Sequence, residues 1–396
     1  MVFLEQRGKL YGCGEKVIIM REKTCYLVSL KYAPGLWKEF RLIGNALCRQ
    51  GHRVIYMVSE SYRWMNEKTD DNVFYVSSSR NAKQILTDTA RYPFYMARRF
   101  ASTFRKYPPS LVCIYNPHPL NVMILRKARH YAPNCIRAIY LHEPSRPGKK
   151  SYGFKGRLMF NIIDLTQSAA VAETTDIILP SPYAIELFNE SYNNYHGRVH
   201  YAPLLLSDNP AVKSGPRRYF SMVGRFNFAK RLDLFVDTIN YAAKHKADFD
   251  FKIVTSSPIK EYLRNLTPEG KQRLVINHKN NISDEEIAEC VSESYAVLCL
   301  QPMITQSGVV PVAFMNSTPV IARNVSGFTQ YVKHGYNGWV LPDQCNSQNI
   351  LAAMEAVRYG IVHLSIGAKQ TFDNTFSEKN WASCYEWLTN MLTRDD

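Results

Sequence analysis

The chain has 396 residues, of which 46% are hydrophobic, enough for two or three domains with complete cores. No stretch reaches the roughly 18 consecutive apolar residues that a membrane-spanning helix needs, so we expect none. The formal net charge of +15 is uneven, because residues 1–215 hold 30 Lys and Arg against 16 Asp and Glu, whereas residues 216–396 hold 19 against 18. A basic half beside a nearly neutral half is typical of a surface that faces anionic lipid or another polyanion.

The cysteines indicate the redox environment. There are nine, and none forms a C-x-x-C pair. Most lie inside apolar runs that we predict to be strands or helices. This pattern predicts reduced, buried thiols in a cytoplasmic protein, and it argues against a disulfide framework or a zinc site.

A βαβ unit opens the clearly patterned part of the chain. Residues 24–30 predict a strand, 37–49 an amphipathic helix and 54–58 a second strand. This order starts a doubly wound parallel sheet, in which ligands bind at the carboxyl ends of the strands. The loop with Gly35 lies at such an end, so we predict that it binds substrate; a plain Pro-Gly turn is the alternative.

Residues 91–107, RYPFYMARRFASTFRKY, interleave aromatic side chains with five cations. Basic amphipathic helices with aromatics are typical of segments that lie on a membrane surface. The alternative is an ordinary surface helix that packs on the sheet through its aromatic side chains. We expect no nucleic acid partner, since the sequence has no helix-turn-helix, zinc finger or RNA-binding aromatic motif.

Histidines follow two predicted strands of the first half. The strand at 110–115 ends in Asn116 and His118, and the strand at 135–141 ends in His142. Parallel strands bring these loops to one rim of the sheet, where imidazoles could handle protons near neutral pH. Each could equally be a loop residue that only makes structural hydrogen bonds.

The rest of the chain continues the alternation of strands and helices. In the first half we predict helices at 157–172 and 183–190 and strands at 177–179 and 198–201. The polar stretch 207–217, with two prolines, is the predicted linker between domains. After it we predict strands at 219–223, 251–255, 274–277, 296–300, 319–322 and 339–341, with helices from 231, from 260, at 284–293 and at 310–316.

The stretch YFSMVGRFNFAKRLD at 219–233 is the most informative. Gly224 ends a predicted strand, Arg225 follows at once, and Lys230 and Arg231 stand where a helix begins. Helix starts prefer acids, so cations there indicate that an anion is held in the same place. A diphosphate fits, because Arg offers a fork of donors and Lys a mobile charge. A solvated basic turn is the alternative.

Two blocks carry a resemblance to a known family: VGRFNFAKRLD at 223–233 and SGVVPVAFMNSTPVIARNVSGFTQYVKHGYNGWVLP at 307–342. They resemble the retaining family-four glycosyltransferases, whose fold is GT-B, an α/β arrangement of two Rossmann-like domains facing across a cleft. The resemblance implies an acceptor-binding domain over residues 1–206 and a nucleotide-sugar-binding domain over 218–377. It also implies a terminal helix, 378–394, that packs back on the first domain.

The resemblance also assigns roles to single residues. Arg225 and Lys230 match the pair that grips the donor diphosphate, and His142 matches a histidine that positions substrate. The helix start at Gly308 would present free N–H groups to the same phosphates. The full set of residues that we expect to bind substrate is Gly35, Asn116, His118, Gly224, Thr305, Gln306, Ser307, Gly308, Val309 and Val310.

One departure from the family pattern concerns donor recognition. The family has two glutamates eight positions apart, and the corresponding positions here are Thr305 and Ala313. Neither side chain can accept two strong hydrogen bonds as a carboxylate does. We expect Gln306 and Ser307 to stand in for them, or activity to be lost.

The resemblance therefore implies a metal-independent transferase. It would move a sugar, with retention, from a nucleotide-diphosphate sugar to a glycan or lipid-linked acceptor in polysaccharide biosynthesis. From the basic first half we expect a cytoplasmic protein, peripheral at the inner face of the membrane. No cofactor is expected besides the donor substrate. A non-catalytic GT-B subunit that binds a partner or glycan is one alternative, and a sugar-nucleotide epimerase is another.

Overall fold

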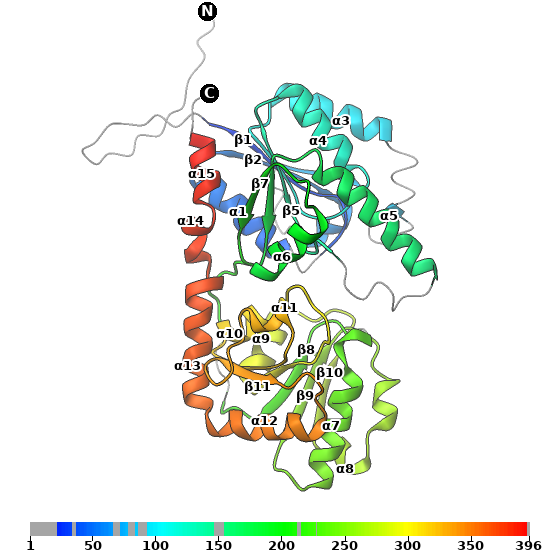
Figure 1. Cartoon of the computed structure of the whole chain (residues 1–396), viewed down its shortest axis with the longest axis vertical. Helices are drawn as coiled ribbons and strands as arrows, with labels where there is room; N and C mark the ends of the chain where they lie inside the picture. The colour runs from blue at the N-terminus through cyan, green and yellow to red at the C-terminus, as the bar shows by residue number, and fades with distance from the viewer. Residues whose placement is uncertain are drawn as a thin grey trace, which may run out of the picture.

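The structure, a computed structural model, describes residues 22–33, 37–65, 72–77, 84–85, 93–145, 154–211, 215–226 and 228–393. These residues form two α/β domains stacked one above the other (Figure 1). One sheet has seven strands in the order β3-β2-β1-β4-β5-β6-β7, and the other has six in the order β10-β9-β8-β11-β12-β13. All strand pairs are parallel. The prediction of two Rossmann-like domains is confirmed.

Helices cover both faces of the first sheet. Helix α1 lies on one face, and α3, α4, α5 and α6 lie on the other. Each face is dry, because buried aliphatic and aromatic side chains fill the space under the helices. The strands are β1 (Thr24–Ser29), β2 (Arg53–Ser59), β3 (Val73–Ser77), β4 (Leu111–Ile114), β5 (Ile136–Tyr140), β6 (Asp176–Leu179) and β7 (Arg198–Tyr201). The helices are α1 (Trp37–Arg49), α3 (Pro93–Lys106), α4 (Asn121–Tyr131), α5 (Phe154–Val171) and α6 (Pro182–Ser191).

The second domain repeats this plan. Helices α7 and α12 pack on one face of its sheet, and α9 and α10 pack on the other. The strands are β8 (Tyr219–Val223), β9 (Asp250–Thr255), β10 (Leu274–His278), β11 (Ser294–Cys299), β12 (Val320–Arg323) and β13 (Gly338–Leu341). The helices are α7 (Leu232–Lys244), α8 (Pro268–Gln272), α9 (Asp284–Ser292), α10 (Val309–Met315), α11 (Ser326–Thr329), α12 (Ser347–Tyr359) and α13 (Ile361–Thr371).

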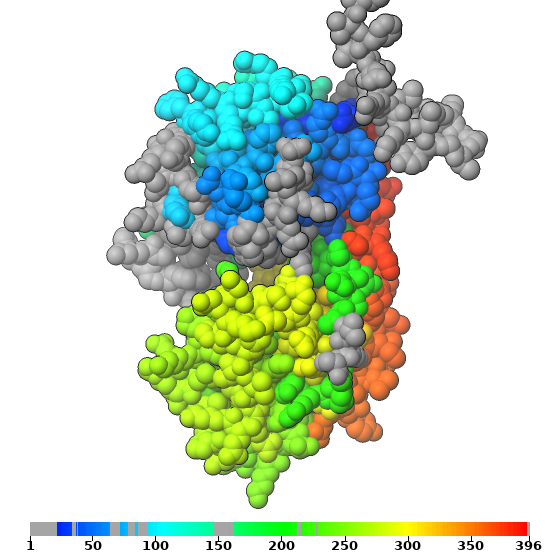
Figure 2. Space-filling view, turned by 180° about the vertical axis from the view of Figure 1, so that it is seen from behind, coloured from blue at the N-terminus to red at the C-terminus, as the bar shows by residue number. Residues whose placement is uncertain are grey.

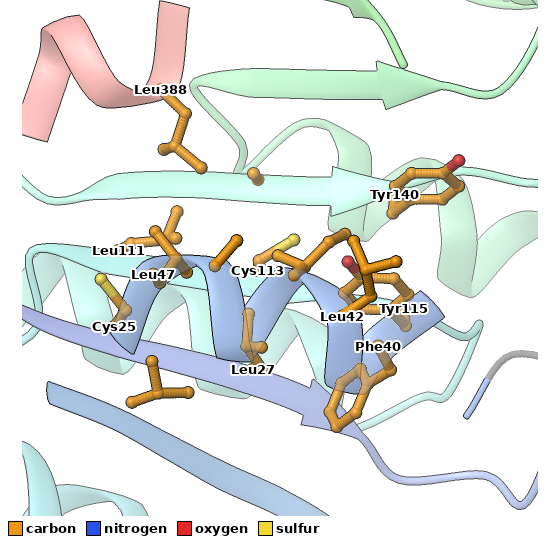
Figure 3. Close-up of a cluster of buried hydrophobic side chains, with 14 of the residues drawn as sticks. Cys25, Leu27, Phe40, Leu42, Leu47, Leu111, Cys113, Tyr115, Tyr140 and Leu388 are labelled. Carbon is orange, nitrogen blue, oxygen red and sulfur yellow. The ribbon is translucent and has the colours of Figure 1, made fainter. Parts of the chain in front are cut away.

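The end of the chain runs along one edge of both domains (Figure 2). After α13 come a π turn (Phe372–Phe376), a 3-10 turn (Glu378–Asn380), α14 (Trp381–Cys384) and α15 (Glu386–Thr393). Leu388 of α15 belongs to the same buried cluster of the first domain as Leu111 and Tyr140 (Figure 3). The single terminal helix predicted at 378–394 is thus several short helical pieces.

Several further elements differ from the predictions. Strand β3 and helices α4, α11, α12 and α13 were not predicted from the sequence. The helix predicted from Lys260 is a 3-10 turn (Tyr262–Asn265) followed by the five-residue α8. Pro268 explains this break, because the residue before a proline is driven out of the helical conformation, and Thr267 has an extended ψ of 160°.

Among the described residues no single helix has the length and hydropathy of a membrane span. The helix pair Ser347–Tyr359 and Ile361–Phe376 meets those criteria only when taken together, across a bend of 89°.

Candidate anion site between the domains

Gly224 makes the sharp turn that begins the site. It follows β8, and its φ of 96° lies in the left-handed region that favours glycine. Its N–H donates to the carbonyl oxygen of Val254 at 2.9 Å, so the turn is tied to β9. The Ser257 hydroxyl then accepts from the N–H of Phe226 at 2.8 Å. These bonds fix the backbone on either side of Arg225.

Lys230 reaches back over this turn. Its Nζ atom is 3.6 Å from the place where a Cβ on Gly224 would lie, and 5.7 Å from the ring centre of Phe226. Burial lowers the pKa of the Lys230 ammonium from its ordinary value. No ion pair joins Lys230 to any acid of the described chain. A desolvated cation without a countercharge is a favourable place for an anion.

Two neighbouring arginines have different environments. Arg225 is exposed and makes no hydrogen bond or ion pair within the part of the chain that the structure describes. Arg231 instead donates to Asp233 at 3.0 Å and directly precedes α7. Of the three cations singled out in the sequence, Arg225 and Lys230 are therefore available to a ligand, whereas Arg231 is paired.

The start of α10 lies opposite Gly224. A Cβ on Gly224 would be 3.9 Å from a methyl group of Val309, and one on Gly308 would meet open space. The backbone of Gly308, with φ −70° and ψ −15°, needs no glycine. A glycine there leaves room for a ligand to approach the backbone closely.

The sequence analysis expects free N–H groups at this helix start, but one of them is already bonded. The N–H of Val309 donates to the Ser307 hydroxyl at 3.3 Å. The side chain of Val310 points into the core, so only its backbone could meet a ligand.

The loop before α10 is mostly buried. Thr305 is buried and its carbonyl oxygen accepts from Gln330 at 3.2 Å, while Ala313 is fully buried in the core. The Gln306 amide nitrogen is buried without a hydrogen-bond partner among the described residues. Because buried polar groups are normally hydrogen-bonded, this amide is the group of the loop that we expect to bond to a ligand.

In the first domain, Asn116 and His118 have structural contacts. The Asn116 amide donates to the Ser29 hydroxyl at 2.7 Å and to the Lys31 carbonyl at 3.3 Å. His118 is 2% exposed and its Nδ1 accepts from the N–H of Leu120. Both side chains hold the loops at the carboxyl ends of β1 and β4. Their predicted contact with substrate stays a prediction.

Tyr62 completes this scaffold and was not singled out from the sequence. Its hydroxyl is 3.1 Å from the Ser29 hydroxyl and accepts from the N–H of Ala33 at 2.8 Å. It thus anchors the start of the loop with Gly35, which lies outside the described residues. No local motif marks Tyr62, because the bonds join segments about 30 positions apart in the sequence.

His142 follows β5 at the same rim. Its ring centre is 4.6 Å from that of Tyr140, and its Nε2 is buried without a partner in the described chain. Burial lowers the pKa of His142 to about 4. At neutral pH this imidazole is therefore uncharged, and it can donate or accept one hydrogen bond at the buried nitrogen.

The two sheets meet through their carboxyl ends. Tyr183, which follows β6, donates its N–H to the Gln330 side chain, which follows β12, at 3.1 Å. Figure 1 shows the corresponding helices, α6 and α11, facing each other between the domains. The loops after β5 and β8, with His142 and Gly224, therefore lie on the facing sides of the two domains.

Comparisons with known proteins agree with this arrangement. Residues 207–358 match the family model described as Glycosyl transferases group 1. Comparison with curated protein sequences gave no match.

Solved structures are similar over nearly the whole chain. A sucrose-phosphate synthase from Thermosynechococcus elongatus is 14% identical with a TM-score of 0.70, covering 94% of this chain and 99% of that one. The pneumococcal O-GlcNAc transferase GtfA, in complex with UDP and GlcNAc, is 11% identical with a TM-score of 0.67, covering 94% and 100%. A glycosyltransferase from Rickettsia africae is 15% identical with a TM-score of 0.66, covering 93% and 99%. The chain therefore has the GT-B fold, and its second domain is similar to the group 1 glycosyl transferases.

Proposed function

We propose that the protein is a glycosyltransferase that takes a sugar from a nucleotide-diphosphate donor. The observation that carries this proposal is the Lys230 ammonium, which is desolvated over Gly224, has no acidic partner in the described chain and shares the surroundings of Gly224 with the start of α10. These residues lie inside the stretch that matches the group 1 family model. Two similar solved structures, the pneumococcal O-GlcNAc transferase GtfA and Anabaena HepE, are complexes with UDP and UDP-glucose, respectively.

The proposed reaction retains the configuration of the sugar. The bond from the anomeric carbon to the diphosphate oxygen breaks, and a bond from that carbon to the acceptor oxygen forms on the same face. The departing phosphate oxygen takes the acceptor's proton, so the products are the glycosylated acceptor and a nucleoside diphosphate. Negative charge grows on that diphosphate, and Arg225 and Lys230 stabilise it. His142, neutral at working pH, orients a hydroxyl by one hydrogen bond.

Donor recognition would rest on amides and hydroxyls in place of carboxylates. Thr305 and Ala313 stand at the positions that we match to the two family glutamates. The Gln306 amide nitrogen, which has no hydrogen-bond partner among the described residues, is the proposed partner of a sugar hydroxyl. The same substitution supports the second proposal, a non-catalytic GT-B subunit that binds sugar nucleotide or glycan without turnover.

Turnover separates these two proposals. We expect the wild-type protein to release nucleoside diphosphate from at least one of the UDP, ADP and GDP sugars, with the anomeric configuration retained by NMR. Since two protein cations would stabilise the leaving group, the rate should not change in EDTA. Binding of a sugar nucleotide without any turnover, with a full range of acceptors, would favour the non-catalytic subunit, and inversion or a requirement for metal would contradict the mechanism.

We further propose that the acceptor lies at an anionic membrane surface on the cytoplasmic side. Two helices of the first domain support this. Phe94 and Tyr95 of α3 are 84% and 55% exposed, although they are large and apolar or aromatic. The exposed cations Arg98, Arg105 and Lys106 follow on the same helix, which contains no acidic residue.

Helix α5 adds an exposed apolar stripe to this surface. Leu158, Ile162 and Leu165 are spaced by four and three residues, so they share one helical face, and all three are exposed. Helix α4 packs against both α3 and α5, which places the two helices on one side of the domain. Exposed apolar side chains beside cations that make no ion pair among the described residues match the chemistry of an anionic bilayer.

A further inference from the structure

The Gln330 side chain joins three parts of the molecule. Its amide oxygen accepts from the N–H of Tyr183 in the first domain at 3.1 Å. Its amide nitrogen donates to the carbonyl oxygen of Thr305 at 3.2 Å and to that of Gly327 at 3.1 Å. One side chain therefore bridges the first domain and the loop that leads to Gly308.

The next residue strengthens the link to the first domain. The Tyr331 hydroxyl donates to the carbonyl oxygen of Pro180 at 2.9 Å and lies 3.4 Å from the hydroxyl of Tyr201. Both partners belong to the first domain, and Pro180 lies three residues before Tyr183. The turn at the end of α11 is thus anchored on the start of α6 by two neighbouring side chains.

On its other side, α11 is in close contact with the loop before α10. A Cβ on Gly327 would lie 1.9 Å from the carbonyl oxygen of Ile304, so the two backbones touch. Together with the bond from Gln330 to Thr305, this contact ties the loop at 304–308 to α11. That loop leads through Gly308 to Val309, which lies near Gly224.

We propose that Gln330 is a positioning residue that couples the relative movement of the domains to the anion site. In this proposal, a change in the relative orientation of the domains displaces the start of α6. The hydrogen bonds of Gln330 and Tyr331 pass that displacement to α11, and α11 passes it to the loop at 304–308. Donor phosphates would then be fully enclosed in only one relative orientation of the two domains. The functional part of this inference rests on the proposed transfer reaction, whereas the coupling itself does not.

Two variants separate a coupling role from a local one. Gln330→Met keeps the length of the side chain and removes all its bonds, while Tyr331→Phe removes only the hydroxyl that meets Pro180 and Tyr201. Gln370→Met is the matched control, because Gln370 accepts from Tyr336 on the exposed side of the same domain. Amide hydrogen exchange of the peptide over residues 303–309 is the readout, and it needs no ligand.

We expect exchange of this peptide to quicken about tenfold in both Gln330→Met and Tyr331→Phe, the effect of losing one buried hydrogen bond, and to stay unchanged in Gln370→Met. Faster exchange in Gln330→Met alone would mean that Gln330 only fastens the loop locally, which overturns the coupling. No change in either variant would also overturn it.

A kinetic arm tests the link to function. With the sugar nucleotide that the wild-type protein turns over, Gln330→Met should lower kcat about tenfold and change KM little, because Arg225 and Lys230 still hold the diphosphate. If wild-type protein turns over none, the proposed function fails while the exchange result still decides the coupling.

Discussion

Glu39 is buried in the first turn of α1, at 2% exposure, under the aromatic side chains that line the first-domain core. Both its carboxyl oxygens lack a hydrogen-bond partner among the described residues, and the nearby Tyr140 hydroxyl donates to Ala202 instead. Burial raises the pKa of Glu39 to about 8. The side chain is therefore protonated at neutral pH, in contact with the core that α15 covers.

This raised pKa predicts a pH-dependent stability. Between the unfolded pKa, about 4.3, and about 8, the folded protein keeps a proton that the unfolded chain releases. The free energy of unfolding should therefore fall as pH rises through this window, by up to about 1.4 kcal/mol per pH unit from this group, and level off above it. Glu39→Gln should remove that slope.

Denaturant unfolding at several pH values between 5 and 9 measures this effect. Glu355→Gln is the control, since Glu355 is exposed on α12 and should leave the profile of the wild-type protein unchanged. If the difference in stability between Glu39→Gln and the wild-type protein is the same at pH 5 and pH 8, Glu39 is charged in the folded state and the interpretation of its burial is wrong.

At the scale of elements, α3 and α5 carry the prediction about membranes. The protein should bind vesicles that contain phosphatidylglycerol, should bind phosphatidylcholine vesicles weakly, and should dissociate as salt rises, because each cation contributes about 1 kcal/mol near an anionic surface. Replacing Leu158, Ile162 and Leu165 by Ser should weaken binding, as should replacing Arg98, Arg99, Arg105 and Lys106 by Gln. Co-sedimentation at several salt concentrations measures both.

The second domain offers a matched control for this surface. Tyr359, Val362 and Ile366 are also exposed and apolar, at 98%, 75% and 54%, but lie on α12 and α13. Their replacement by Ser should leave vesicle binding unchanged. Equal loss from both triple variants, or binding that ignores salt and lipid charge, would contradict the assignment to α3 and α5.

Some elements with a local signal were predicted, although α12, which begins at a capping box between Asn346 and Asn349, was not. Helix α9 begins at a capping box between Ser283 and Glu286, and β8 is an apolar run that a glycine ends. Helix α4 was missed because it has no such start: Leu120 stands at its N-cap without a side-chain bond, and its first turn has no acid. Strand β3 is a half-buried edge strand with little apolar alternation.

At the scale of the whole molecule, alternation of strands and helices was enough to predict two Rossmann-like domains. Contacts between distant segments were not predictable in the same way. Tyr62 with Ser29, inside the first domain, and Gln330 with Tyr183, across the two domains, join residues that no periodicity connects. The sequence also singled out Arg225, Lys230 and Arg231 together, because side-chain geometry and not pattern decides that Arg231 pairs with Asp233, two positions along the chain.

The binding of a diphosphate by Arg225 and Lys230 tests the central claim most directly. Isothermal titration with UDP, ADP and GDP, and with the bare nucleosides, would be compared for the wild-type protein, Arg225→Ala, Lys230→Ala and the control Arg231→Gln. Each charge-assisted contact is worth about 1.5–3 kcal/mol, so both alanine variants should weaken the preferred diphosphate by about tenfold or more, leave its nucleoside nearly unaffected and leave the fold intact. Arg231→Gln, whose arginine is paired with Asp233, should bind the diphosphate as the wild-type protein does. Unchanged diphosphate affinity in both alanine variants would contradict the account, and the stretch around Gly224 would then be only a solvated basic turn.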